Sequence, residues 1–345
     1  MKDQVANQPG VGWAILGTGA LADRSIAPAI MDQVGCNLVA VYSRDASRGT
    51  DFSHRHGEPT VYTDYDELLN DAAVDVVYVA TPNSLHAEQG ISALNAGKHV
   101  LVEKPMALSV SEGRRMLAAA DASGVFLGVG FHLRHKPTTV AARDLVAAGE
   151  VGSVFMLDVH VAGDKEFYPF DTWRSDRRLS GGGTILNQGT HAFDLVRFVT
   201  GAEIVSVTAQ VDKVGIEDVF AGVCTLSSGA IAVLSSHQNL RGTRPDYSIL
   251  GSDGWVEARG GTSPAPQEEC RVHRQGEVRL LATSPHSAYW HEVANFTDAA
   301  RGGARFLGNG HDGLAVIAAA NAMYESAESG RTVLLEEKLA DRLPG

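Results

Sequence analysis

A lysine stands where an apolar strand ends, in the stretch HVLVEKP at residues 99–105. Ligands of doubly wound sheets bind at the carboxyl ends of parallel strands, so Lys104 would face a bound cofactor or substrate. Burial beside a positively charged ligand would lower its pKa, and the amine could then accept a proton from a reacting group or donate one to it. Glu103 could hold Lys104 through a charge-assisted hydrogen bond. The alternative is a strand-end lysine in a surface ion pair.

A histidine with polar neighbours is the second candidate for proton chemistry. His191 lies four residues after Asn187 and three before Asp194. If a helix begins near Gly189, Asn187 lies at its cap and His191 in its first turns. The imidazole could share the proton or hydrogen-bond the reacting hydroxyl, and Asp194 at i+3 could orient it. Asn187 cannot accept a proton, so we expect it to orient substrate. The alternative is a capping histidine packed under the loop.

The stretch GTGALA, residues 17–22, matches the G-x-G-x-x-G/A pattern of dinucleotide-binding loops. It follows a short apolar strand and opens a helix, whose N-terminal amides would bind phosphates. Gly17 permits the tight turn, Gly19 lets a pyrophosphate approach the backbone, and Ala22 allows close packing. The alternative is a structural turn in an unrelated α/β domain. The residues predicted to hold the cofactor here are Gly17, Thr18, Gly19, Ala20 and Leu21.

The cofactor type depends on the end of the second strand, which reads VYSRD at residues 41–45. An acid here would bind the ribose 2′-hydroxyl of NAD. Ser43 and Arg44 stand there instead, and a hydroxyl and a guanidinium suit a 2′-phosphate. Arg48, one turn later, could add charge. The sequence therefore favours NADP over NAD, with Ser43 and Arg44 as cofactor ligands. Alternatively, Arg44 only stacks on adenine.

An aromatic-rich loop, residues 163–180, carries three candidates for substrate binding: Tyr168, Trp173 and Arg174. Aromatic and guanidinium groups suit sugar faces and hydroxyls, although ordinary packing explains these residues equally well. Arg134 and His132 follow the last strand of the first part and could also border the substrate pocket. On a strand, a spacing of three places His132 and His135 on opposite faces, so no metal site is predicted.

Alternating strand-like and helix-like segments must position the first group of residues. Continuous apolar strands alternating with helices predict a parallel, doubly wound sheet, hence an α/β Rossmann domain over residues 1–130. The expected strands are 13–16, 37–43, 74–80, 100–102 and 125–129, and the expected helices include 84–96 and 109–122.

The rhythm changes after Gly149, where strands follow one another with few helices between them. This pattern predicts an α+β domain over residues 131–345 with a mixed, largely antiparallel sheet. We expect the last helices to pack back on the Rossmann domain. The expected strands are 154–161, 204–211, 219–226, 230–236 and 247–258, and the expected helices are 189–199, 291–300 and 312–329.

Composition narrows the class of protein. The 345 residues carry a formal net charge of −12, which disfavours nucleic acid and anionic membranes as partners. No apolar run approaches the roughly 18 residues that cross a bilayer, and no signal peptide is visible. The three cysteines, widely spaced and odd in number, predict free thiols and a cytoplasmic protein.

Taken together, these motifs resemble the Gfo/Idh/MocA oxidoreductases, named after glucose–fructose oxidoreductase, inositol dehydrogenase and a rhizopine-catabolism protein. The resemblance covers nearly the whole chain, and the order and spacing of EKP and GGG…HxxD are its specific part. The motifs are GTG at 17–19, ATPNSLH at 80–86, EKP at 103–105, GGG at 181–183 and NQGTHAFD at 187–194.

The resemblance implies an NAD(P)-dependent dehydrogenase or reductase of a secondary alcohol on a sugar, a cyclitol or a sugar derivative. It implies an open-faced second sheet that mediates a homodimer or homotetramer, and it strengthens the catalytic assignment of Lys104 and His191. Many family dehydrogenases carry aspartate where Asn187 stands, which argues against an Asp–His relay here. The residues implied to line the nicotinamide side are Thr81, Asn83, His86, Glu103 and Lys104.

Two other functions stay open at this point. Some relatives resemble glycosidases that keep NAD bound and oxidise the sugar transiently, and net formation of reduced nicotinamide would separate them from a dehydrogenase. Other relatives use the fold as a dinucleotide-sensing regulator. An intact Glu103-Lys104-Pro105 motif with His191 argues against a sensor, which needs no proton shuttle.

Overall fold

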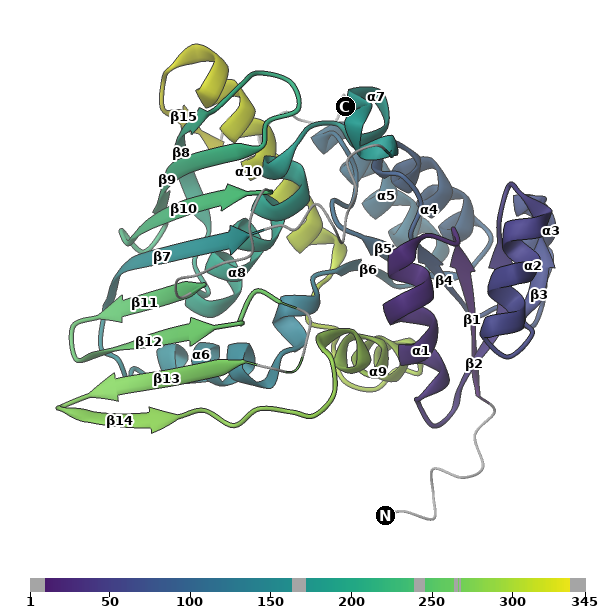
Figure 1. Ribbon diagram of the computed structural model, residues 1–345, viewed down its shortest axis with the longest axis horizontal. Helices are drawn as coiled ribbons and strands as arrows, with labels where there is room; N and C mark the ends of the chain where they lie inside the picture. Colours follow the sequence, from purple (N-terminus) through teal and green to yellow (C-terminus); the bar gives the residue numbers. More distant parts are fainter. Residues whose placement is uncertain (1–9, 163–171, 239–245, 264–265, 267, 336–345) are drawn as a thin grey trace.

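The computed structural model describes residues 10–162, 172–238, 246–263, 266 and 268–335. Its first sheet is parallel, with the strand order β3-β2-β1-β4-β5-β6 (Figure 1). The order reverses beside β1 and β4, and in such sheets ligands bind in the crevice at that reversal. Its strands are β1 (Val11–Leu16), β2 (Cys36–Tyr42), β3 (Thr60–Tyr62), β4 (Val76–Val79), β5 (His99–Glu103) and β6 (Leu127–Gly130).

Helices cover both faces of this sheet because its strands are apolar on both faces. Trp13 and Ile15 of β1 pack on one side with α1 and α9, and Val77 and Val100 pack on the other with α4 and α5. A π-helical turn, Ala22–Ile26, precedes α1. The helices around this sheet are α1 (Ala27–Met31), α2 (Ala46–Arg55), α3 (Tyr65–Asn70), α4 (His86–Asn95), α5 (Val110–Ser123) and α9 (Ala288–Ala300).

The second sheet has the order β14-β13-β12-β11-β7-β10-β9-β8-β15. Strands β7 and β10 run parallel, and the other neighbours are antiparallel. Among the described residues, the helices of this sheet lie on one of its faces (Figure 1). Side chains of β9 alternate between buried and exposed. Its strands are β7 (Val154–Ala162), β8 (Ile204–Val211), β9 (Val219–Leu226), β10 (Ile231–His237), β11 (Tyr247–Gly251), β12 (Gly254–Arg259), β13 (Glu269–Arg274), β14 (Glu277–Leu280) and β15 (Val333–Leu334); its helices are α6 (Pro137–Ala147), α7 (Arg177–Ser180), α8 (Thr190–Thr200) and α10 (Gly310–Ser329).

The two C-terminal helices connect the two sheets. Phe296 of α9 packs against Trp13 of β1 with ring centroids 5.6 Å apart, and Phe306 packs against Phe296 at 5.0 Å. Helix α10 lies against both α5 and β8. The end of the chain therefore completes the core of the first sheet as well as that of the second.

The predicted fold class is confirmed: a parallel, doubly wound sheet is followed by a mixed, mostly antiparallel one. Residues 247–258, predicted as one strand, form the hairpin β11–β12, because the chain turns at Ser252 and Asp253. The sequence patterns also passed over several short or polar elements, namely α2, α3, α6, β3, β13 and β14. The division into domains at residue 130 stays a prediction.

Candidate active site

The glycine loop after β1 has the geometry that its pattern predicted. Gly17 has a φ of +100°, and a Cβ there would lie 2.9 Å from the carbonyl oxygen of Ala80. Apart from its chain neighbours, no atom of the described residues lies within 4 Å of a Cβ built on Gly19, so open space lies above this residue. A dinucleotide fits such a cradle, because its pyrophosphate can approach the backbone at Gly19 and the first amides of the following helix.

The end of β2 differs in part from the prediction. Ser43 is buried, and its hydroxyl donates a hydrogen bond of 2.8 Å to the carbonyl oxygen of Asp45. The Asp45 carboxylate caps α2 and pairs with Arg48 at 3.3 Å. Arg44 is exposed. The hydroxyl of Ser43 is therefore used within the turn, and of the two predicted cofactor ligands Arg44 is the exposed one.

Lys104 reaches from the end of β5 toward the second sheet. Its Nζ donates a hydrogen bond of 2.5 Å to the backbone carbonyl of Asn187. The pKa of Lys104 is lowered to about 8, chiefly because burial removes water from the ammonium group; Glu103 opposes this shift and Arg174 adds to it. The amine can therefore exchange a proton close to neutral pH.

Glu103 was predicted to hold Lys104 through a charge-assisted hydrogen bond, and in the structure the group of Lys104 that donates this bond is its backbone N–H. The Glu103 carboxylate accepts hydrogen bonds from the backbone N–H of Lys104, at 3.2 Å, and from the buried hydroxyl of Tyr78. Burial raises the pKa of Glu103, and the nearby Lys104 opposes this. The peptide bond between Lys104 and Pro105 is cis. Glu103 thus fixes the backbone of the turn that presents Lys104.

The loop after β4 builds a wall beside Lys104. The ring nitrogens of His86 lie 2.8 Å from the carbonyl oxygen of Pro105 and 2.9 Å from that of Thr81. Asn83 Nδ2 donates to the carbonyl oxygen of Ser180 at 2.9 Å, which ties this loop to the second part of the chain. These side chains, implied by the resemblance to line the nicotinamide, therefore hold the loops of the cleft together.

Three glycines allow the second part of the chain to pack closely at the cleft. A Cβ on Gly182 would lie 2.0 Å from the hydroxyl of Tyr324, and one on Gly183 would lie 2.1 Å from the carbonyl oxygen of Glu217. The Glu217 carboxylate accepts hydrogen bonds from the N–H groups of Gly183 and Ile185, at 3.1 and 2.8 Å. Glu217 therefore caps the helical segment that carries Asn187.

Asn187 and His191 lie on one continuous helical segment that starts earlier than predicted. A π-helical turn, Ile185–Gly189, contains Asn187 and leads directly into α8, so Asn187 lies inside the helix instead of at its cap. His191 is buried, and its ring contacts that of His132 edge to face at 4.7 Å. The pKa of His191 lies well below its usual value, first because of burial and then because of the Lys104 and His132 charges. The imidazole is neutral at neutral pH.

Arg134 was predicted to border the pocket, but it closes a buried ion-pair network. Its Nε and Nη2 donate to the carboxylate oxygens of Asp194 at 2.8 and 2.6 Å, and its Nη1 lies 2.9 Å from Asp312. The predicted contact between Asp194 and His191 is replaced by this pair, because a buried carboxylate requires full pairing. We therefore correct the assignment of Arg134 to a structural role.

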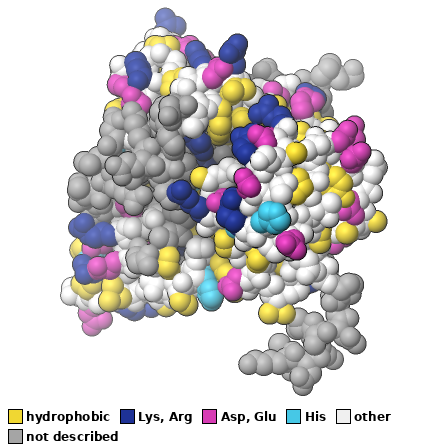
Figure 2. Space-filling model, turned by 45° about the vertical axis from the view of Figure 1, so that its right-hand side comes forward, with side chains coloured by type: hydrophobic (Ala, Val, Ile, Leu, Met, Phe, Trp, Pro, Cys, Tyr) yellow, Lys and Arg dark blue, Asp and Glu magenta, His cyan; other side chains and the backbone are white. Residues whose placement is uncertain are grey.

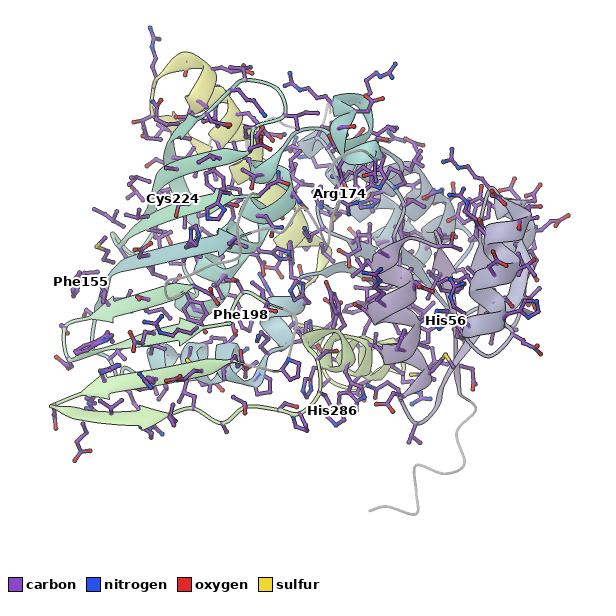
Figure 3. The ribbon with its side chains drawn as sticks, in the orientation of Figure 1. His56, Phe155, Arg174, Phe198, Cys224 and His286 are labelled. Carbon is purple, nitrogen blue, oxygen red and sulfur yellow. The ribbon has the colours of Figure 1, made fainter. Side chains whose placement is uncertain are left out.

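Of the three candidates in the aromatic-rich loop, Tyr168 lies outside the described residues. Trp173 and Arg174 are half-buried in a 3-10 helix, Trp173–Ser175, with the guanidinium of Arg174 over the Trp173 ring at 4.4 Å. Figure 3 places Arg174 above the junction of the two sheets, and its charge acts on both Lys104 and Glu103. Lys and Arg side chains gather in the middle of the face seen in Figure 2.

His132 and His135 lie on a 3-10 helix, His132–His135, and not on the strand assumed from the sequence. The ring of His132 lies between those of His191 and Tyr289, and the ring of His135 stacks on Phe306.

Across the described ranges, no group of three or more His, Cys, Asp or Glu side chains could hold a metal ion. In the same ranges, no helix combines the length and apolar character that a membrane span requires.

Sequence reasoning missed three buried polar residues near the site. Tyr78 interrupts an apolar strand, and Glu292 interrupts the apolar face of α9, so both left a signal in the sequence. Burial, followed by repulsion from Glu103 and Asp194, raises the pKa of Glu292 well above its usual value. Gln238 follows β10 beside Asn187, and nothing in its sequence neighbourhood marks it.

Comparison with known proteins gives matches over almost the whole chain. The model of the oxidoreductase family with an NAD-binding Rossmann fold matches residues 11–131, and that of the GFO/IDH/MocA C-terminal domain matches residues 139–257. The 1,5-anhydro-D-fructose reductase of Ensifer adhaerens is 31% identical over 334 residues, which cover 95% of this chain and 99% of the relative. The D-xylose 1-dehydrogenase (NADP(+)) 2 of Haloferax volcanii is 30% identical and covers 94% of this chain and 99% of its own.

Among solved structures, the aldose-aldose oxidoreductase from Caulobacter crescentus, complexed with glycerol, has a TM-score of 0.86 and 30% sequence identity. The match covers 94% of this chain and 99% of that one. The chain is therefore similar to that protein in both fold and sequence over almost its whole length.

Proposed function

Because this chain belongs to the Gfo/Idh/MocA oxidoreductase family, we propose that it transfers a hydride between NAD(P) and a secondary alcohol or ketone of a sugar, a cyclitol or a sugar derivative. Membership itself makes the protein an NAD(P)-dependent oxidoreductase, as its motifs predicted. One observation supports the assignment of proton transfer to Lys104. Its Nζ is buried, donates a hydrogen bond to the backbone carbonyl of Asn187, and has a pKa lowered to about 8.

A bound nicotinamide supplies the hydride acceptor or donor, and the protein must handle the proton. In oxidation the hydroxyl proton passes to the neutral amine of Lys104, and in reduction the ammonium group returns it to the oxygen. With a pKa of about 8, both forms of Lys104 are populated at neutral and mildly alkaline pH. The same residue can therefore serve both directions.

His191 acts in this proposal as a neutral hydrogen-bonding group. Its depressed pKa makes it a poor store for a proton, but its ring can form a hydrogen bond with the reacting oxygen and aim it at Lys104. Its Nδ1 is buried and has no hydrogen-bond partner within the described part of the chain. Such a free ring nitrogen beside Lys104 supports a ligand-facing role.

The substrate class is proposed from the relatives whose names specify sugars or sugar derivatives. The test is a screen of sugars, inositols, amino sugars and sugar nucleotides with NAD and with NADP, read at the absorbance of reduced nicotinamide. We expect net formation of NADH or NADPH with at least one polyol. Glycoside cleavage without net reduction would favour a transient-oxidation glycosidase, and cofactor binding without any turnover would favour a sensor.

Arg44 is proposed to select NADP by pairing with the 2′-phosphate. It is exposed beside the cleft, and the neighbouring Asp45 carboxylate is occupied by Arg48. Arg44→Ala should weaken NADP binding about 10- to 100-fold, because a hydrogen bond to a charged group contributes about 1.5–3 kcal/mol. Binding of NAD should change less than about threefold. The measurement is the Kd of each cofactor by fluorescence titration.

A matched control for Arg44→Ala is Arg115→Ala, which removes an exposed arginine paired with Glu88 on the far side of α4 and α5. It should leave the NADP/NAD ratio unchanged. A wild type that prefers NAD, with both cofactors weakened equally in Arg44→Ala, would mean that Arg44 only stacks on adenine.

The open face of the second sheet is proposed to pair with a second copy of the chain. Large apolar side chains stand exposed on several of its strands, among them Phe155 at 56%, Val223 at 46% and Ile231 at 47% exposure. Figure 3 shows Phe155 at the outer end of this sheet. Phe155→Lys with Val223→Lys should convert a dimer or tetramer to monomer, measured by light scattering after gel filtration. A wild-type monomer at micromolar concentration would contradict the proposal.

We further propose a cytoplasmic location. The three cysteines are buried and form no disulfide bond with one another, and free thiols are typical of proteins in a reducing compartment.

A further inference from the structure

A pair of side-chain amides in the site has no part in the proton chemistry described above. Nδ2 of Asn187 donates a hydrogen bond of 3.4 Å to Oε1 of Gln238. Gln238 directly follows β10, is only 2% exposed, and donates its backbone N–H to the carbonyl oxygen of Asp218 at 3.1 Å. The sheet therefore fixes the backbone of Gln238, and Asn187 contacts its side-chain amide.

The amide pair lies on the covered face of the second sheet and not on its open face. Ser236, two residues before Gln238 and therefore on the same face of the strand, contacts Thr184 through their hydroxyl oxygens at 2.7 Å. Thr184 immediately precedes the π-helical turn that carries Asn187. Gln238 consequently faces the helical segment of the active site.

The Nε2 group of Gln238 is buried and has no hydrogen-bond partner among the residues that the structure describes. Its two N–H donors are removed from water and make no hydrogen bond to the described residues, whereas buried donors in native proteins rarely lack a hydrogen-bond partner. A group of this kind beside a cleft is satisfied when a ligand oxygen arrives.

The position of the pair relative to Lys104 suggests which ligand oxygen this is. The backbone carbonyl of Asn187 holds Nζ of Lys104 at 2.5 Å, and the side chain of the same residue contacts Gln238. An oxygen bound by the amide pair would therefore lie close to the oxygen that exchanges its proton with Lys104. Neighbouring hydroxyls of one sugar ring have this relation.

We propose that Asn187 and Gln238 bind the hydroxyl next to the reacting carbon, so that the substrates are vicinal diols. The inference rests on the proposed dehydrogenase function. In the oxidation the C–H bond of the reacting carbon gives its hydride to NAD(P)⁺ and the O–H bond gives its proton to Lys104. The products are NAD(P)H and a carbonyl compound, which is a ketone at a secondary alcohol carbon and a lactone at C1 of an aldose. The neighbouring hydroxyl is unchanged; it accepts from an amide N–H and donates to an amide oxygen, which an amide pair permits and a purely cationic site does not.

The test compares a polyol with its analogue that lacks the neighbouring hydroxyl. D-Glucose and 2-deoxy-D-glucose form the pair for oxidation at C1, and myo-inositol and its monodeoxy analogues form the pairs for a ring carbon. The variants are Gln238→Leu, which removes the amide, and Gln238→Glu, which keeps the shape but replaces the donors by acceptors. Gln210→Leu, at an exposed position of β8, is the matched control.

For wild type and Gln210→Leu, kcat/KM should be at least about tenfold higher for the polyol than for the deoxy analogue, because a site built for a hydroxyl rejects its absence. In Gln238→Leu and Gln238→Glu this ratio should fall below about threefold. The loss should come from a higher KM for the polyol, with kcat/KM for the deoxy analogue nearly unchanged.

Three results would overturn the inference. Equal losses for the polyol and the deoxy analogue in Gln238→Leu would mean that Gln238 only supports Asn187 structurally. An unchanged ratio would mean that the amide does not contact the second hydroxyl. Absence of turnover by wild type with every alcohol and both nicotinamides would remove the proposed function and this inference with it, whereas turnover with an unchanged ratio removes the inference alone.

Discussion

Replacing Lys104 by methionine is expected to lower kcat by about 10²–10⁴-fold, the usual scale for the loss of a general acid or base. Methionine fills the space of the lysine stem but has no group that accepts the hydroxyl proton. Because Lys104 acts on the substrate oxygen, the Kd of NADH or NADPH should stay within about threefold of wild type. The measurements are steady-state kinetics and a nicotinamide fluorescence titration.

The same lysine predicts opposite pH profiles in the two directions. Its pKa is about 8, and oxidation requires the neutral amine. The kcat/KM for oxidation should therefore rise with pH and level off above pH 8, whereas that for reduction should fall above it. Lys104→Met should lose this dependence. Lys213→Met, at an exposed lysine paired with Asp218, is the control, and a Lys104→Met variant within tenfold of wild type would exclude the proton role.

The position of Lys104 could be predicted from local sequence, but its partner could not. An apolar strand that ends in Glu-Lys-Pro indicates that the lysine side chain lies at the carboxyl edge of a sheet. The acceptor of its proton-bearing group, however, is a backbone carbonyl at Asn187, 83 residues later. Every residue has a backbone carbonyl, so no residue type could reveal this contact.

Helical spacing predicted neighbours for His191 but not the outcome of their competition. Asp194 at i+3 was close enough to orient the ring, yet it pairs with Arg134, which is 60 residues earlier. A buried carboxylate is stabilised more by a bidentate guanidinium than by a neutral imidazole. Deciding between the two required the packing of the 3-10 helix at His132–His135 against α8, which only the tertiary structure supplies.

The order of strand-like and helix-like segments predicted the architecture well because both sheets bury at least one face. The parallel strands read as continuous apolar runs separated by helices, and the strands of the second sheet follow one another with few helices between them. The prediction failed at β11 and β12, where the turn Gly-Ser-Asp-Gly at residues 251–254 separates two strands of similar character. This sequence is a turn signal, and the prediction of one continuous strand passed over it. The prediction also failed for β14, whose four residues are all exposed and leave no buried face to detect.

Two glycine-to-alanine substitutions should impair different properties, although the added methyl group is the same. Gly183→Ala should lower the stability of the fold, and Gly19→Ala should weaken cofactor binding. In Gly183→Ala the methyl would lie 2.1 Å from the carbonyl oxygen of Glu217 and 2.5 Å from its backbone nitrogen. Both atoms are backbone, so they cannot move aside as a flexible side chain would. In Gly19→Ala the methyl would meet no atom within 4 Å in the described part of the chain, its two chain neighbours aside, but it would occupy the space left for a pyrophosphate.

Gly183→Ala should therefore lower the free energy of unfolding by about 3 kcal/mol or more, the upper range for overpacking, and the melting temperature by roughly 4 °C. It should also lower kcat, because the carbonyl oxygen of Gly183 accepts the N–H of Asn187 at 3.0 Å and so sets the carbonyl that holds Lys104. Gly19→Ala should melt within about 1 °C of wild type and weaken NADH or NADPH binding at least about tenfold. Calorimetry and cofactor titration on both variants measure the contrast. If Gly183→Ala had the melting temperature of wild type, the turn would relax around a methyl group, and close packing would not explain the three consecutive glycines. If Gly19→Ala bound the cofactor with unchanged affinity, the open space above Gly19 would not be where the pyrophosphate lies.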